Sequence, residues 1–123
     1  MDQKEDRPDV ILVVDDEPLV RLDTMHMLYR AGFEVCEAVS AQEAMAVLNE
    51  RSDVTVVVTD VQMPGRNGVD LAKHIRETHP TIAILLISGH RRPDGIPANV
   101  EFLSKPCRMD LLVSRVREAT ARR

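Results

Sequence analysis

The chain of 123 residues carries 20 acidic and 16 basic side chains, which gives a formal net charge of −4 at pH 7. This acidic balance, with only 2% aromatic residues, argues against a nucleic-acid partner, because such partners favour a basic face and stacking platforms. The hydrophobic content of 44% is that of a globular protein, and we find neither a membrane-spanning apolar stretch nor a signal peptide. We therefore expect a cytoplasmic protein without a membrane partner.

The domain organisation is expected to be simple. Residues 1–9 are polar and predict a flexible N-terminal segment, and residues 10–121 are of a size for one domain. The chain ends directly after the last predicted helix, so we expect no output domain. Cys36 and Cys107 lack metal-ligand spacing and a core of this size needs no disulfide, which favours two reduced thiols.

In the first half of the chain, short apolar runs alternate with helical patterns. Pro18 favours the first turn of a helix that Gly32 ends, and apolar residues recur near helical spacing between them. Ser40 and Glu43 form a capping box that begins the next helix. The predicted elements are strands over Val10–Val14, Phe33–Ala38 and Val54–Thr59, with helices over residues 18–30 and from residue 41. This order is typical of a parallel sheet with helices on both faces.

The second half continues the alternation with one irregular stretch. Asn67 is a suitable N-cap for a helix over Gly68–Thr78, and strands follow over Ile82–Ile87 and Val100–Leu103. A last helix begins near Met109. Between the fourth and fifth strands, residues 89–99 contain two prolines and two glycines, so we expect a loop with at most one helical turn.

Charged or hydroxyl side chains follow four of the five predicted strands. Asp15 and Asp16 end the first, Asp60 the third and Ser88 the fourth, and Lys105 follows the fifth. The carboxyl ends of parallel strands meet at one edge, where open α/β sheets bind ligands. Crowded carboxylates need a compensating cation, and hard oxygen ligands suit Mg²⁺. A lysine and a hydroxyl nearby would stabilise phosphoryl oxygens, and Asp60 is the best candidate nucleophile.

These residues also allow other interpretations. An Asp after a strand is often only a turn former, but four complementary strand ends together favour a site. A flavin-binding protein would need a hydroxyl- and glycine-rich phosphate loop after the first strand, whereas this chain has Asp-Asp-Glu-Pro. A haloacid-dehalogenase-type phosphatase would need a second acid where Gln62 stands. His90, close after Ser88, is either a surface residue or a contact of a phosphoryl group or its attacking water.

The order Asp15-Asp16, Asp60, Ser88, Lys105-Pro106, with Met63-Pro64-Gly65 and Gly68, resembles the receiver domain of two-component response regulators. The resemblance implies a flavodoxin-like five-stranded sheet of order 2-1-3-4-5. It also implies that Asp60 is the phosphoacceptor. Asp16, Asp15 and the backbone carbonyl of Gln62 would join Asp60 in binding Mg²⁺, and Ser88 and Lys105 would bind the phosphoryl oxygens.

The resemblance also implies a switch and a function. Ser88 would move toward the phosphoryl group and Phe102 would rotate inward, although Phe102 can equally be a plain core residue. The chain between Ser88 and Lys105 is several residues shorter than in a typical receiver, so the family's fourth helix is expected to be short or degraded, and we expect a monomer or weak dimer.

The function expected is that of a single-domain response regulator. It would take a phosphoryl group from a sensor histidine kinase or histidine phosphotransfer protein and act as a relay intermediate, sink or switch for an unknown downstream protein. Beyond Mg²⁺-dependent self-phosphorylation and autodephosphorylation it would not be an enzyme. The alternative is an interaction module of the same fold that needs no phosphorylation.

Overall fold

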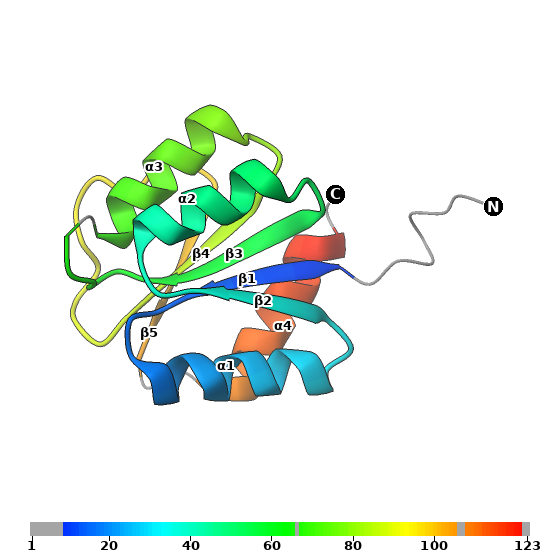
Figure 1. The fold of residues 1–123 in the computed structure, drawn as a ribbon. Helices are drawn as coiled ribbons and strands as arrows, with labels where there is room; N and C mark the ends of the chain where they lie inside the picture. The colour runs from blue at the N-terminus through cyan, green and yellow to red at the C-terminus, as the bar shows by residue number, and fades with distance from the viewer. Residues whose placement is uncertain (1–8, 66, 106–107, 122–123) are drawn as a thin grey trace.

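The computed structural model describes residues 9–65, 67–105 and 108–121. In these residues five parallel strands form one sheet of order β2-β1-β3-β4-β5, and four helices connect or follow them (Figure 1). The order along the chain is β1 Val10–Val14, α1 Pro18–Arg30, β2 Glu34–Ala38, α2 Ala41–Glu50, β3 Val54–Asp60, α3 Gly68–Thr78, β4 Ala83–Ser88, β5 Val100–Ser104 and α4 Met109–Ala121. The predicted fold class is confirmed.

The sheet is buried because helices cover both of its faces. α2 and α3 lie on one face and α1 and α4 on the other (Figure 1). All five residues of β1 are buried, as are most residues of β3 and β4, which is why the sequence shows unbroken apolar runs there instead of alternation. Leu12 belongs to the apolar cluster under α2 and α3, and Ile11 belongs to the cluster under α1 and α4.

Three strands end later than the sequence pattern predicted. β3 includes Asp60, β4 includes Ser88 and β5 includes Ser104. In the ladders Asp60 pairs with Ile87, and Ser88 pairs with Ser104. The functional candidates Asp60 and Ser88 therefore stand on the sheet itself and not on the loops that follow it.

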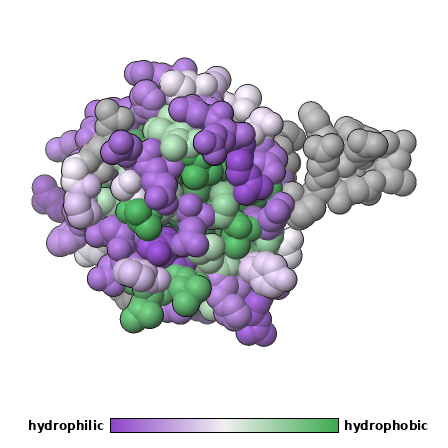
Figure 2. All heavy atoms as spheres, viewed as in Figure 1, coloured by the Kyte–Doolittle hydropathy of each residue, from purple (hydrophilic) through white to green (hydrophobic). Residues whose placement is uncertain are grey.

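Helix α1 is confirmed at its predicted bounds, but it buries little of its apolar surface. Of the residues at helical spacing, Leu28 is fully buried, whereas Leu19 and Leu22 are 74% and 61% exposed. Figure 2 shows apolar side chains, in green, on the surface at the bottom of the view, where α1 lies in Figure 1. The helical spacing predicted the helix correctly but did not predict which side chains face the core.

No helix forms between β4 and β5, as the prolines and glycines predicted. Residues 89–99 run as turns and irregular chain, with Asn99 at a φ of 66°. Arg76 of α3 holds the end of this loop, because its guanidinium donates to the carbonyls of Asn99 at 3.2 Å and Ile82 at 3.1 Å. Ile96 packs against the main apolar cluster. The loop thus packs against the core without helical structure.

Some predictions fall on residues outside the described ranges. They include most of the expected flexible segment 1–9, as well as Pro106 and Cys107. Within the described residues, none of the helices has the length and apolar character needed to cross a membrane.

Candidate functional site

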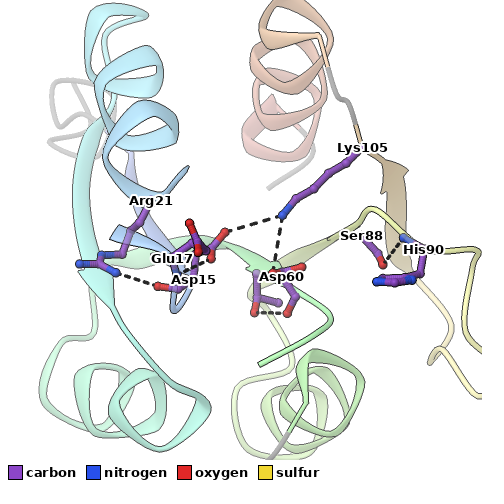
Figure 3. A network of polar contacts seen from close by, with 8 residues as sticks. Asp15, Glu17, Arg21, Asp60, Ser88, His90 and Lys105 are labelled. Carbon is purple, nitrogen blue, oxygen red and sulfur yellow. Dashed lines mark hydrogen bonds and ion pairs between the residues drawn. The ribbon is translucent and has the colours of Figure 1, made fainter. Parts of the chain in front are cut away.

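The strand ends place the candidate residues side by side along one edge of the sheet (Figure 3). Asp15 directly follows β1, Asp60 is the last residue of β3, Ser88 is the last of β4, and Lys105 directly follows β5. Because β1, β3, β4 and β5 are consecutive neighbours in the sheet, their carboxyl ends are adjacent in the same order. The convergence predicted from the sequence is thus present in the fold.

Three carboxylates form the acidic centre of this edge. One carboxylate oxygen from each of Asp15, Asp16 and Asp60 lies within 4.8 Å of the others. The Asp15 and Asp60 side chains are only 8% and 11% exposed, whereas Asp16 is exposed to solvent. This combination of two largely buried carboxylates and one open to water resembles the oxygen-rich, partly hydrated environment that Mg²⁺ prefers.

Lys105 supplies positive charge to the same centre. Its Nζ lies 3.6 Å from Oδ2 of Asp60 and 3.9 Å from Oδ2 of Asp15 (Figure 3). The backbone N–H of Lys105 donates to the carbonyl of Ser88 at 2.7 Å, which fixes the start of the lysine side chain relative to β4. A single ammonium thus faces two of the three carboxylates, and the cluster keeps an excess of negative charge.

The electrostatics of Asp15 indicate that a cation fits here. Burial raises the pKa of Asp15, and the nearby charges of Asp60 and Asp16 raise it further. The backbone N–H of Glu17, which donates to Oδ1 of Asp15 at 2.9 Å, and the charge of Lys105 act in the opposite direction without cancelling the increase in pKa. A divalent cation bound between the carboxylates would relieve this repulsion, so the residues present suit Mg²⁺.

Ser88 lies at the same edge and is 1% exposed. Its Oγ accepts a hydrogen bond from the backbone N–H of His90 at 3.0 Å (Figure 3). The hydroxyl proton remains able to donate to another acceptor, since a hydroxyl both donates and accepts.

The remaining predicted site residues are Gln62 and Phe102. Gln62 is exposed in the loop after β3, and the Mg²⁺ contact of its carbonyl stays a prediction. Phe102 is half-buried on β5, where it packs against the core. The guanidinium of Arg92 lies over its ring, 5.8 Å from the ring centroid. The switch role of Phe102 likewise stays a prediction.

The sequence reasoning did not find two contributors to the site, and it named a third, Gly68, only as part of a loop pattern. Arg21 of α1 donates to the backbone carbonyl of Asp15 at 2.9 Å, and the backbone N–H of Glu17 donates to the Asp15 carboxylate. Gly68 packs directly against the backbone of Asp60 and Val61, where no side-chain carbon would fit. Only Gly68 gave a signal in the sequence, through the loop pattern that it shares with receivers, while the Arg21 contact depends on how α1 packs against the sheet.

A cavity of about 610 Å³ lies beside the acidic centre, between α1, α4 and the sheet. Asp15, Asp60 and Lys105 line its polar end, and apolar side chains that include Val58 and Leu112 line the remainder. The phosphoacceptor candidate is therefore reachable from solvent although its own side chain is largely buried.

The fold and the strand-end residues together define a class, that of doubly wound parallel α/β domains with an acidic, lysine-bearing centre at the carboxyl edge of the sheet. Comparison with known proteins narrows this class. The family model of the response regulator receiver domain matches residues 11–117, and the chain belongs to this family. Receiver domains are switches that accept phosphoryl groups from histidine kinases and bind Mg²⁺ at such an aspartate cluster.

Individual relatives agree with this assignment. The chain is 35% identical over 114 residues to the sensor kinase CckA of Brucella abortus, and the match covers 88% of this chain but 12% of that protein. The chain thus spans only a small part of this relative's length.

Solved structures agree as well. A receiver domain protein from Clostridium thermocellum shows a TM-score of 0.86 at 29% identity, covering 92% of this chain and 94% of that one. The response regulator TrrA of Thermotoga maritima, crystallised in complex with Mg²⁺-BeF, shows a TM-score of 0.84 at 29% identity, covering 90% of this chain and 98% of that one.

Proposed function

We propose that this protein is a response regulator that takes a phosphoryl group from a phosphohistidine donor onto Asp60 in the presence of Mg²⁺. The observation that carries the proposal is the position of Asp60, which ends β3 within the three-carboxylate cluster and 3.6 Å from the Lys105 ammonium. Phosphoryl transfer depends mainly on positioning and on neutralising charge, and this arrangement is suited to both.

The chemistry of the transfer follows from the residues. A carboxylate oxygen of Asp60 attacks the phosphorus atom, the P–N bond of the donor phosphohistidine breaks, and the imidazole leaves with the bonding electron pair. Lys105 and the hydroxyl of Ser88 would bind the phosphoryl oxygens and hold the group in line. Attack by water on the aspartyl phosphate would later break its P–O bond and regenerate Asp60 with release of inorganic phosphate.

The metal would be held by Asp16 and Asp60, by Asp15, and by the backbone carbonyl of Gln62. When bound it supplies positive charge that offsets the negative charge of the phosphoryl oxygens and of the cluster. Asp15, which is nearly buried, would tune the charge of the site, while the exposed Asp16 is open to a hydrated ion.

Signalling would depend on the segment that leads away from Ser88. Movement of the Ser88 hydroxyl toward the phosphoryl group would alter the loop 89–99 and the half-buried Phe102. The protein would act as a relay intermediate, a phosphate sink or a switch for a downstream partner. The loop between β4 and β5 takes the place of a helix, so the signal would be presented on a different surface from that of a receiver with the additional helix.

Intact-protein mass spectrometry after incubation with Mg²⁺ and acetyl phosphate tests the proposal. We expect one added phosphoryl group in the wild type and none in Asp60→Ala or in the presence of EDTA. Asp53→Ala is a matched control, because Asp53 is an exposed carboxylate that directly precedes β3, whereas Asp60 is the last residue of β3. The absence of any mass increase in the wild type would favour a phosphorylation-independent interaction module, and an increase that survives Asp60→Ala would refute the assignment of the acceptor.

A further inference from the structure

Arg21 connects three elements next to the acidic cluster. It lies in the first turns of α1, and its Nη1 donates to the backbone carbonyl of Asp15 at 2.9 Å (Figure 3). Its Nε donates to Oε1 of Glu37 on β2 at 2.7 Å. The Arg21 side chain is only 14% exposed. A guanidinium with two directed hydrogen bonds and little freedom to move is a rigid contact.

This contact completes the fixation of the Asp15 backbone. The N–H of Asp15 donates to the carbonyl of Ala38 on β2 at 3.2 Å, so β2 holds one side of the residue and Arg21 holds the other. The carbonyl that Arg21 binds belongs to the peptide unit that joins Asp15 to Asp16. Because a peptide unit is planar, fixing its carbonyl also fixes the direction in which the chain enters Asp16.

Asp16 depends on this support more than the other two carboxylates do. Its side chain is exposed, and among the described residues no hydrogen bond or ion pair holds its carboxylate. The Asp15 carboxylate is held by the Glu17 N–H, and Asp60 stands in the β3 ladder. The backbone is therefore the main determinant of where the Asp16 carboxylate points.

We propose that Arg21 is a positioning residue of the cation site, which orients Asp16 toward Mg²⁺ through the Asp15–Asp16 peptide. The inference rests on the proposed function, because it concerns the same site. Residues that hydrogen-bond to metal ligands without contacting the metal typically lower metal affinity by about 10–100-fold when they are removed. Arg21 would act through the backbone, because its hydrogen bonds go to the Asp15 carbonyl and to Glu37 and not to a carboxylate of the cluster.

The positive charge of Arg21 allows a positioning role to be distinguished from a general electrostatic effect on Mg²⁺ binding. A cation close to a metal site repels Mg²⁺, so removing it would strengthen Mg²⁺ binding if charge alone mattered. Removing a positioning contact weakens Mg²⁺ binding. The two explanations therefore predict opposite signs for Arg21→Gln.

Arg21→Lys separates the same explanations in a second way. Lysine keeps the positive charge but lacks the planar fork that reaches both Glu37 and the Asp15 carbonyl. A pure charge effect leaves Mg²⁺ binding at the wild-type level in this variant, whereas the positioning role predicts weaker binding.

The experiment is isothermal titration calorimetry of the unphosphorylated protein with MgCl₂ alone, with thermal unfolding in EDTA to verify the fold. We expect the Kd for Mg²⁺ to increase about tenfold in Arg21→Gln and several-fold in Arg21→Lys. Arg51→Gln is the matched control, because it removes the same charge and a guanidinium–carboxylate pair, that with Asp53, at the opposite edge of the sheet. Its Kd should stay within about twofold of the wild type.

The outcomes are distinct. A Kd for Arg21→Gln that equals or falls below the wild-type value overturns the inference and leaves the proposed function intact, as does wild-type affinity in Arg21→Lys. If Arg21→Gln does not fold, Arg21→Lys decides, since it keeps the charge and most of the side-chain volume. A wild-type protein that binds no Mg²⁺ overturns both the inference and the proposed function.

Discussion

Gly68 offers a test of how the backbone at the end of β3, and with it Asp60, is held in place. It is the first residue of α3, capped by Asn67, and its N–H donates to the carbonyl of Val61 at 2.8 Å. A side-chain carbon at this position would overlap the carbonyl oxygen of Asp60 and lie 3.0 Å from the carbonyl carbon of Asp60 and from Cα of Val61. All three atoms belong to the backbone of Asp60 and Val61 at the end of β3, so they cannot move aside as a flexible side chain would.

The magnitude for Gly68→Ala follows from two opposing effects. Alanine is favoured over glycine within a helix by about 1 kcal/mol, and less at its first residue. Forcing an extra methyl group into packed surroundings costs typically about 1–3 kcal/mol. Because the surroundings here are backbone, we take the upper part of that range and expect a net loss of about 1–2 kcal/mol in the free energy of unfolding.

Urea unfolding followed by circular dichroism measures this loss, with Gly89→Ala as the control. A side-chain carbon at Gly89 would lie 3.9 Å from Cβ of Lys105, which is ordinary van der Waals contact, so Gly89→Ala should change the free energy of unfolding far less. The shift of the Asp60 carbonyl should also slow phosphorylation of Gly68→Ala by acetyl phosphate. A Gly68→Ala protein with wild-type stability and a wild-type phosphorylation rate would refute the argument that this contact fixes Asp60.

Two further predictions follow from the charges. Burial and the neighbouring Asp60 raise the pKa of Asp15 above its ordinary 3.8, so ionised Asp15 reduces stability at neutral pH, and the stability that its protonated form confers is present below pH 3.8 and lost as the pH rises through the raised pKa. In EDTA at pH 7, Asp15→Asn should therefore be more stable than the wild type in urea unfolding, with the difference vanishing below about pH 3.8; a less stable variant at pH 7 would contradict this. Arg92→Ala, which removes the guanidinium 5.8 Å from the Phe102 ring, should lower the free energy of unfolding by about 0.5–1 kcal/mol, and equal effects in Arg91→Ala would show that the stacking contributes nothing.

The sheet and the meeting of its strand ends could be predicted because both follow from short-range rules. Unbroken apolar runs such as Ile11–Val14 indicate strands covered on both faces, and parallel strands must end at one common edge. The placement of Asp15, Asp60 and Lys105 near one another needed no further information. The missing helix was equally predictable, because prolines and glycines at positions 89–99 exclude it by local backbone chemistry.

The remaining features depend on long-range packing that no local pattern encodes. Spacing alone did not show that Leu19 and Leu22 would face solvent, because their exposure depends on how α1 is rotated against the sheet. The bridge from Arg21 to Glu37 joins residues 16 positions apart on different elements. Such a contact exists only once α1 has packed against β1 and β2, so the sequence gives no local sign of it.

The two sides of the site differ in how regular their backbone is, because residues 89–99 form an irregular loop beside the sheet. Asp60 pairs with Ile87 in the ladder between β3 and β4, whereas the chain after Ser88 leaves regular structure at once. Few local hydrogen bonds protect such a segment, so it can open at a small free-energy cost while the sheet stays folded. Amide hydrogens in the loop should therefore exchange with solvent much faster than those of β3 and β4. If Asp60 is phosphorylated as we propose, a phosphoryl group bound by Ser88 would change how often this segment opens, without any movement of the sheet.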